Sequence, residues 1–549
     1  LLHALVSRRT GRSGNYIRFT EANVLVNYTP TPVDESNDES SNGESTDNSN
    51  NDEDSEGNHD VHPITSATAA RGKSATTTKR QKVVWKTVKQ NKSAKDIPVW
   101  QGALPDADAI RLPIQYFRDF FDSDLLDTIV EQSNLYCTQQ NPNGALKLDK
   151  NELEQFIGTV VYMSVFHLPR SRMYWSSACR VPHVADVMSR DRWEEIKHFI
   201  HFNDNMAPNN SDKLFKVRSL IDSLLPKCQA LPQDQMLSIA EQMVPFKGKL
   251  SLKQYIPNKP YKWGYKIFVL CDTTGLVHSF DIFTGKIEPV PGLPDIGAGG
   301  NIVLKLAQVI HGAVNHLVYF DNWFSSLDLF VALANNGIPA LGTVRQCRLR
   351  GCTLEEQQVV VDNVEIRAVK LFDKRGVIVA STFASAQPVS NIERWDKNLK
   401  QKVTVECASI ISLYNKFMGG VDALDALIAY YRIHIRSKKY YHRLFFHFVD
   451  MVIVNSWLLY WRDCESLTVP RKKQKDLLAF RTSIAQALST VMPTQEVRSD
   501  GVGHWPVVES ERQRCKLPHC KGQTVIKCAK CTVHLCLNKN KDCFREFHK

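Results

Sequence analysis

The chain has 549 residues, of which 43% are apolar, and this length predicts three or four domains. Its net charge is +11, although residues 34–58 contain ten Asp or Glu and no Lys or Arg, so the remainder is more basic still. Such an excess of positive charge favours a polyanionic partner, nucleic acid before membrane, over a merely soluble basic protein. The longest apolar stretch, 445–461, is interrupted by polar residues, so it predicts a buried or amphipathic helix and no membrane span.

Residues 1–98 are predicted to be a disordered N-terminal region, first acidic and then basic. The stretch 34–58 is rich in Ser and Asn and has no apolar side chain to offset the entropy of ordering. Basic residues among Ser, Ala and Thr follow in 59–98, which indicates a nuclear-import or DNA-contacting linker, or only a solvated one. These basic residues include Lys79, Arg80, Lys82, Lys86 and Lys89.

Residues 99–230 are predicted to form a helical domain. Apolar residues recur at three- and four-residue spacings from Phe117 to Val130, with Ser123 as the expected N-cap. A second helix is expected from about Glu152 to Leu168, where Pro169 stops it, and a third around 193–200.

The periodicity changes after residue 231, and the fold class predicted for the whole chain is multidomain α+β. Three β-rich runs are followed by a helix, a strand and another helix up to residue 342. This β-β-β-α-β-α order is typical of an RNase H-like core. Residues 343–405 indicate a β-rich insertion, and 406–500 supply the last part of the core and a helical DNA-binding segment.

Three aspartates stand where a divalent cation could be held. Asp321 ends an apolar strand in NHLVYFDNWFSS, at the rim of the predicted sheet. Asp422 and Asp425, in YNKFMGGVDALDAL, lie three residues apart on one face of a helix that begins after two glycines. Stabilisation of the helix dipole by N-terminal acids is the alternative to metal binding for this pair.

A run of basic residues follows in RIHIRSKKYYHRLFFHF. If one helix continues through it, four of the basic residues share one stripe, with an aromatic ring beside them, as a DNA-backbone contact requires. A solvated charged face is the alternative. The predicted DNA-binding residues are Arg432, Arg436, Lys438, Lys439, Tyr440 and Arg443.

The cysteines are distributed unevenly, because six of the 14 fall in the last 35 residues. Clustered Cys with interspersed His, in a chain without a secretion signal, indicates zinc ligation and not a disulfide framework. Residues 501–549 are therefore predicted to be a zinc module with two ions. The eight expected ligands are His504, Cys515, Cys520, Cys528, Cys531, Cys536, Cys543 and His548, with His519 and His534 as rivals.

Seven segments in the same order resemble the piggyBac-type DNA transposases, and the resemblance covers about residues 99–548. Among them are LSIAEQMVPFKGKLSLKQYIPNKPYKWGYKIFVLCD, YFDNWFSS, ALGTVRQCR and YNKFMGGVDALD, followed by the terminal Cys/His block. The resemblance implies a nuclear, dimeric enzyme that binds double-stranded transposon ends and excises and integrates DNA at TTAA targets. In this family three aspartates on an RNase H-like fold hold two Mg²⁺ ions.

Carried over residue by residue, the resemblance makes Asp321 the second catalytic aspartate, Asp422 the third and Asp425 an accessory acid. Tyr440 falls where the family often has tryptophan near the DNA ends. The position of the first aspartate is Ala240, in Ser-Ile-Ala-Glu, and a methyl group cannot ligate Mg²⁺. Because side chains alternate along a strand, Glu241 is expected to point away from the metals. The Mg²⁺ site is therefore expected to be impaired and the chain catalytically inactive.

Likeness to cross-brace modules implies one zinc site of His504, Cys515, Cys520 and Cys536, and another of Cys528, Cys531, Cys543 and His548. Such modules bind terminal DNA in this family and histone tails elsewhere. Three hypotheses stay open: a transposase with an introduced Ala240, a natural copy that persists as a DNA-binding regulator, and a protein that contacts chromatin through its zinc module.

Overall fold

The computed structural model describes most of the chain beyond residue 96 and one short segment before it. The described residues are 83–88, 97–207, 211–248, 250–257, 259–352, 356–372, 376–396, 399–489, 503–518, 520–531 and 533–549. The predicted disorder of 1–82 lies outside them. Within 83–88 the expectation of a disordered linker is wrong, since β1 (Lys86–Thr87) pairs with a strand of the main sheet. The Trp85 indole also donates a hydrogen bond to the Leu349 carbonyl at 2.8 Å.

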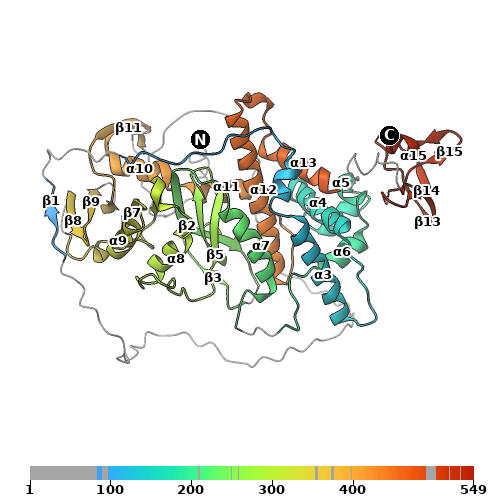
Figure 1. The fold of residues 1–549 in the computed structure, drawn as a ribbon, viewed down its shortest axis with the longest axis horizontal. Helices are drawn as coiled ribbons and strands as arrows, with labels where there is room; N and C mark the ends of the chain where they lie inside the picture. Colours follow the sequence, from blue (N-terminus) through green and yellow to red (C-terminus); the bar gives the residue numbers. More distant parts are fainter. Residues whose placement is uncertain are drawn as a thin grey trace.

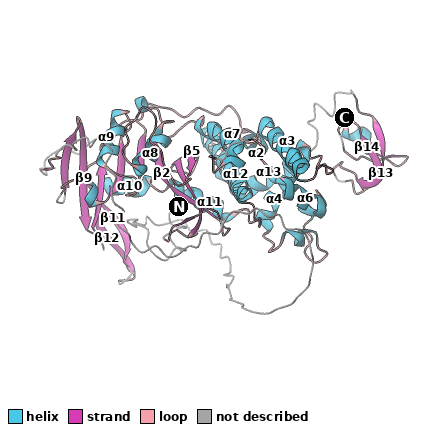
Figure 2. Ribbon diagram, turned by 90° about the horizontal axis from the view of Figure 1, so that it is seen from below, coloured by secondary structure: helices cyan, strands magenta, loops and turns pink. Residues whose placement is uncertain are grey.

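The helical part lies beside the sheet in both views of the molecule (Figures 1 and 2). Helices from residues 113–229 pack there with two long helices from near the end of the chain. They are α2 (Pro113–Arg118), α3 (Ser123–Gln140), α4 (Lys150–Phe166), α5 (Pro182–Ala185), α6 (Arg190–Phe199), α7 (Arg218–Gln229), α12 (Tyr440–Ser466) and α13 (Leu477–Ser489).

The ends of these helices follow local side-chain chemistry. Asp122, and not the expected Ser123, caps α3, because its carboxylate accepts the Leu125 amide at 3.0 Å. Helix α4 ends at its C-cap residue His167, which adopts a left-handed conformation with φ 44°. That residue ends the helix two positions before Pro169, where the sequence predicts the stop.

Among the described helices, α12 alone is long and apolar enough to cross a membrane. However, 83% of its most apolar window is buried inside the protein. Three polar residues of this stretch, His447, Asp450 and Asn455, are buried as well and have polar partners; the carboxylate of Asp450, for example, pairs with Arg481 at 2.5 Å. The expectation of a buried helix at 445–461 is therefore confirmed.

A ten-stranded mixed sheet forms the second part of the molecule. Its order is β1-β8-β9-β10-β7-β6-β2-β4-β3, and β5 also pairs with β4. The strand β2 runs antiparallel to β4 and parallel to β6. The strands are β2 (Met236–Pro245), β3 (Gln254–Tyr255), β4 (Trp263–Asp272), β5 (Val277–Ile282), β6 (Leu317–Phe320), β7 (Ala340–Val344), β8 (Glu356–Val361), β9 (Val364–Phe372) and β10 (Gly376–Ser381).

The strands of the predicted insertion extend this sheet instead of forming a separate one. Strand β10 pairs antiparallel with β7, and β9 and β8 continue outward. Only the hairpin of β11 (Val389–Asp396) and β12 (Gln401–Ala408) stands apart from the large sheet among the described strands of this segment.

Each face of the sheet contributes to a different apolar core. Leu237 and Ile239 face a core with α8 (Ala298–Ala307) and α9 (Leu327–Asn335). The alternate position Ala240 faces a larger core. That core is shared with the helical part, α10 (Ser409–Phe417) and α11 (Gly420–Tyr430). The sheet is therefore covered by helices on both faces, which is why its strands are almost continuously apolar.

The C-terminal module is small and has its own buried cluster of cysteines and apolar residues. In both views it lies beyond the helical part, and Arg514 reaches Asp186 with an ion pair of 3.6 Å. Its elements are β13 (Pro506–Arg514), β14 (Gln523–Cys528), β15 (Leu537–Asn538), β16 (Lys541–Asp542) and α15 (Cys543–Phe547).

Candidate metal centres and nucleic-acid interface

The parallel pairing of β2 with β6 brings Ala240 next to Asp321. The registered pairs end with Ile239 opposite Phe320, so Ala240 and Asp321 are the next residues along the two strands. Adjacent strands lie about 4.8 Å apart, and equivalent positions point to the same face. Asp321 therefore stands beside a methyl group where the family resemblance expects a second carboxylate.

Helix α11 brings its two aspartates to the same place, and a glycine permits this approach. A Cβ on Gly420 would lie 2.1 Å from the Asp272 carbonyl oxygen and 2.6 Å from the Ser238 hydroxyl. Because a Cβ cannot approach a backbone oxygen so closely, only glycine lets the helix begin directly against β2 and β4. Asp422 and Asp425 follow in its first two turns.

Asp425 is held by a chain of buried polar groups. The side-chain Nε2 of Gln242 donates to Asp425 Oδ1 at 2.8 Å, and the side-chain Oε1 of Gln242 lies 2.9 Å from His447 Nε2. Burial raises the pKa of Asp425 above its ordinary value, although Lys259 and the Gln242 hydrogen bond act against that shift. One of its oxygens is thus already used within the protein.

Lys259 lies among the carboxylates of this centre. Its ammonium donates to the Glu241 carbonyl oxygen at 2.7 Å. Burial alone would lower the pKa of Lys259, but four nearby carboxylates outweigh that effect and raise the pKa above its ordinary value. They belong to Asp422, Glu241, Asp425 and Asp321.

The carboxyl group of Asp321 has an unusual environment. Its Oδ1 accepts the Trp323 amide at 2.7 Å. Burial raises the pKa of Asp321 to about 6, and the Glu241 carboxylate adds to the shift. Lys266, whose ammonium lies 4.2 Å from the centre of the Trp323 ring, acts in the opposite direction.

Glu241 follows the expected alternation, yet it does not lie remote from the centre. It pairs with Phe268, which belongs to the core on the face opposite Ala240. Even so, its charge acts on Asp321, and its buried Oε2 has no hydrogen-bond partner among the described residues. The expected orientation of Glu241 away from the Ala240 face thus agrees with the strand pairing, although its charge still acts on Asp321.

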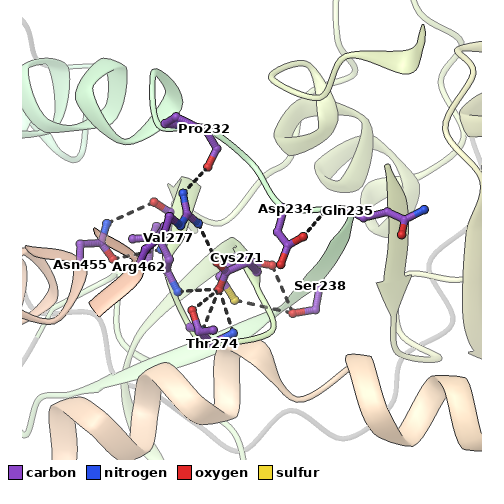
Figure 3. A network of polar contacts seen from close by, with 12 residues as sticks. Pro232, Asp234, Gln235, Ser238, Cys271, Thr274, Val277, Asn455 and Arg462 are labelled. Carbon is purple, nitrogen blue, oxygen red and sulfur yellow. Dashed lines mark hydrogen bonds and ion pairs between the residues drawn. The ribbon is translucent and has the colours of Figure 1, made fainter. Parts of the chain in front are cut away.

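Asp272, the other acid near these strands, is committed to the turn between β4 and β5. Its Oδ1 accepts from the amide and the hydroxyl of Thr274 and from the Gly275 and Leu276 amides, and its Oδ2 accepts from Arg462 at 3.3 Å. Figure 3 shows the surrounding network. A carboxylate with five such donors is a structural group and is not available to a metal.

The residues present do not fit a two-metal centre. Asp321 and Asp422 converge with Asp425, but Ala240 offers no ligand and Gln242 occupies one oxygen of Asp425. The Lys259 ammonium supplies positive charge within the cluster, where bound Mg²⁺ ions would otherwise do so. The protein itself thus offsets part of the negative charge of these carboxylates.

The predicted helical stripe of basic residues is wrong. Helix α11 ends at Tyr430 and α12 begins at Tyr440, so 431–439 form a connector without helical hydrogen bonding. Side chains of α12 hold this connector instead: Asp450 accepts the Ile433 amide at 2.9 Å, and Arg443 donates to the Ile433 carbonyl at 2.8 Å.

Most of the predicted DNA-binding side chains therefore point into the protein. Arg432 is buried against the Tyr261 ring, 4.7 Å from its centre. Arg443 donates to two backbone carbonyls, Lys439 donates to the His198 carbonyl at 2.5 Å, and the Tyr440 hydroxyl donates to the Lys213 carbonyl. Of the six residues, Arg436 and Lys438 remain exposed.

All eight predicted zinc ligands gather into two groups of four in the C-terminal module. Within each group the ligand atoms lie within 4.8 Å of one another. A tetrahedral zinc site with Zn–S bonds of about 2.3 Å has sulfur atoms roughly 3.8 Å apart, and Cys520 and Cys543 are separated by 3.6 Å. The groups are His504, Cys528, Cys531 and His548, and Cys515, Cys520, Cys536 and Cys543.

The expected pairing is wrong for two ligands, since His504 and Cys543 exchange places. The hairpin explains His504: Pro506 pairs with Cys528 at one end of β13 and β14, whereas the Cys515 amide donates to Gly522 at the other. Helix α15 explains Cys543, because it begins at Cys543 and ends next to His548 and so links the two groups. Ligands still alternate between the sites along the chain, as in a cross-brace.

Neighbouring groups support this arrangement. The Gly522 and Cys531 amides donate to the sulfurs of Cys520 and Cys528, each at 3.4 Å, which favours thiolates. The rival His534 is bound elsewhere, with its Nε2 3.0 Å from Glu509. The other rival, His519, lies outside the described residues. The geometry fits two structural zinc ions.

Comparisons with known proteins agree with this class of fold and site. The family model described as "Transposase IS4" matches residues 112–457, which is more than half of the chain. A solved structure of a piggyBac transposase synaptic complex with hairpin DNA is similar in fold, with a TM-score of 0.58. The sequences are 21% identical, and the match covers 70% of this chain and 81% of that one. The protein is thus of the transposase class.

Curated relatives specify the family. Human PiggyBac transposable element-derived protein 2 is 29% identical over 86% of this chain and 83% of its own length. Human PiggyBac transposable element-derived protein 3 is 30% identical over 80% of this chain and 76% of its own length. The chain therefore belongs to the piggyBac-type transposase family.

Sequence reasoning missed several residues of the sheet centre. Lys259 and Gln242 contact the carboxylates only because strands and a hairpin far apart in sequence meet. The one available signal was the basic run KPYKWGYK, but nothing in its spacing distinguishes Lys259 from the other lysines of the run.

Proposed function

We propose that this protein is a transposase-derived DNA-binding protein that holds transposon-end DNA but does not cleave it. The observation that carries the proposal is Ala240 beside Asp321, with the Lys259 ammonium among the remaining carboxylates. Losing one of the three carboxylates that hold the metals removes most of the rate, on the order of several kcal/mol in the barrier.

The sheet supports an RNase H-like core as the ancestral catalytic unit. Its central order is β5-β4-β2-β6-β7, with the first three strands antiparallel and β2, β6 and β7 parallel. The helix α8 precedes β6, and α9 precedes β7, as in the predicted element order. In this proposal 231–342 and 406–500 form the core, 99–230 the helical DNA-binding and dimerisation domain, and 343–405 the insertion.

Double-stranded DNA is the proposed partner. The similar solved structure is a transposase complex with hairpin DNA, and the chain carries a net charge of +11 in spite of its acidic stretch. Because two transposon ends must be brought together, a homodimer that recognises TTAA-flanked ends in the nucleus belongs to the same proposal. The C-terminal module would contribute a DNA-contacting surface stabilised by two zinc ions.

A second function deserves a test because of the module itself. The eight ligands and the alternating connectivity resemble cross-brace domains that bind histone tails. A chromatin contact through this module, with the core as a scaffold, would also explain why all eight ligands persist while the sheet centre has lost one.

The test is a binding and strand-cleavage assay on duplexes of the protein's own transposon end, with Mg²⁺ and with Mn²⁺. We expect a complex in a mobility-shift assay and no nicked product with either metal. Nicking would show that the remaining carboxylates suffice. Absence of binding to the end, together with binding to histone-tail peptides, would favour the chromatin function.

A further inference from the structure

A cavity of about 200 Å³ lies between the end of α4 and the connector from α11 to α12. Its walls come from two parts of the chain, 163–174 with Lys197 on one side and 433–436 on the other. None of the described residues that line it is acidic. Its positively charged or titratable residues are His167, Arg170, Arg172, Lys197, His434 and Arg436.

The walls of this cavity are held by buried contacts. Asp450 and Arg443 bind the two backbone groups of Ile433 and thereby fix the start of the connector. On the other side, the Tyr174 hydroxyl donates to the Met163 carbonyl at 2.8 Å, which closes the turn after α4. The cavity is thus a formed feature of the fold.

The positive charge around the cavity is only partly compensated. Arg172 pairs with Glu194 at 3.0 Å. The carboxylate of Asp450, which binds the Ile433 amide, is already paired with Arg481. By contrast, neither Arg170 nor Arg436 has an ion-pair partner among the described residues, and both side chains are exposed. Two cations from distant parts of the sequence therefore face one opening without a counter-charge.

Two histidines of the cavity wall lie close together. His167 and His434 lie with ring centres 5.2 Å apart. Burial lowers the pKa of His434 to about 4, with His167, Arg443 and Arg432 acting in the same direction. Burial also lowers the pKa of His167, and Arg481 adds to that shift whereas Asp450 opposes it. Both rings are therefore neutral at neutral pH, so the positive charge at the cavity comes from the arginines and Lys197.

We propose that the cavity binds one backbone phosphate of duplex DNA. The phosphate would then contact both the helical part and the connector that follows α11, the helix of Asp422. Arginine is the side chain best suited to phosphate oxygens, since its guanidinium offers several donors in one plane. Exposed positive charge continues along the connector to Lys438, which favours a chain of phosphates over a single free ion. The inference rests on the proposed DNA binding.

The experiment compares two double variants of equal charge change. Arg170→Gln with Arg436→Gln removes the two unpaired cations of the cavity. Arg190→Gln with Lys286→Gln removes two exposed cations outside it, which pair with Asp191 and Glu288. Affinity for the transposon-end duplex is measured by fluorescence anisotropy at several salt concentrations, and thermal unfolding verifies that both variants fold.

We expect the cavity variant to bind at least about fivefold more weakly and to flatten the slope of log K against log salt by about one unit, as loss of one phosphate contact requires. The control variant should keep the slope of the unmodified protein. Inorganic phosphate, titrated by ³¹P NMR, tests the alternative source of the anion.

Each outcome is decisive. If the unmodified protein binds DNA and the cavity variant keeps its slope, the cavity is not a DNA contact and the proposed function stands. The same conclusion follows if the variant loses inorganic phosphate but not DNA. If the unmodified protein binds no DNA, the proposed function itself fails.

Discussion

The two candidate metal centres of this protein differ in how their ligands are brought together. The C-terminal module collects eight ligands from within one short segment, 504–548, and a hairpin and one helical turn suffice to place them. The sheet centre collects residues from β2, the end of β6 and α11, which are far apart in the sequence. The first depends on local spacing and the second on the whole fold.

The difference extends to what holds each region in shape. The module has a small buried cluster, in which five of the nine buried residues are cysteines. We therefore expect its folding to depend on metal. The sheet is covered by two large cores, so we expect its folding not to depend on metal. We consequently expect a lost ligand to be tolerated in the sheet but not in the module.

Zinc removal should break the module and leave the sheet intact, and this is the largest effect we expect. Structural zinc contributes on the order of 10 kcal/mol to the folding of small domains. Metal analysis should give about two ions per chain, and a chelator should abolish hydrogen-exchange protection in 503–549 while β2 stays protected. His504→Ala and His548→Ala should release the same ion, and His534→Gln, as control, should release none. Persistent protection of the chelated module would contradict the comparison.

Restoring the missing ligand should convert the sheet centre toward a metal site. In Ala240→Asp a carboxylate would stand beside Asp321, and we expect Mg²⁺-dependent nicking of the transposon end to rise by at least about 100-fold, or roughly 2.7 kcal/mol. Ala240→Asn is the matched control, because it has the same size without the charge. Equal activity of the two variants, or no rescue by Asp, would show that more than the carboxylate has been lost.

The sequence predicts the module better than the sheet centre for the same physical reason. All eight ligands could be named from Cys and His spacing, and only the partners of His504 and Cys543 were wrong, because the register of β13 with β14 cannot be seen in the sequence. In the sheet, Asp321 and Asp422 could be named by resemblance. The position of Lys259 could not, since it depends on how a hairpin folds back over the carboxylates.

The basic segment 432–443 shows where periodicity fails. Its spacing fits a helix, but the backbone of Ile433 is bound by Asp450 and Arg443, which lie ten or more residues later. These tertiary hydrogen bonds override the local preference and leave residues 431–439 non-helical. The consequence is that Arg436 is presented to solvent and to the basic cavity, whereas Arg432 is buried.

The smallest effect concerns acid, to which the two regions should respond for different reasons. The module loses zinc in acid because its thiolates and histidines take up protons. In the sheet, His278 of β5 is buried, and burial lowers its pKa to about 3, with Arg462 acting in the same direction. In the unfolded chain His278 takes up a proton near pH 6.5, but in the folded chain it does not. Its contribution to stability is therefore complete above pH 6.5 and is lost as pH falls toward 3.

His278→Leu should remove this acid sensitivity from the sheet and leave that of the module unchanged. Between pH 7.5 and 5.0 the variant should lose about 2 kcal/mol less unfolding free energy than the unmodified protein, because pH 5.0 lies roughly 1.5 units below the pKa of an unfolded histidine. Urea unfolding at the two pH values measures this, with zinc content followed in the same samples. His311→Leu, at an exposed position, serves as the control. If His278→Leu loses as much stability in acid as the unmodified protein, the acid response of the sheet resides in other buried groups. His447 on α12 is the first of these to test, because burial lowers its pKa and Gln242 links it to Asp425.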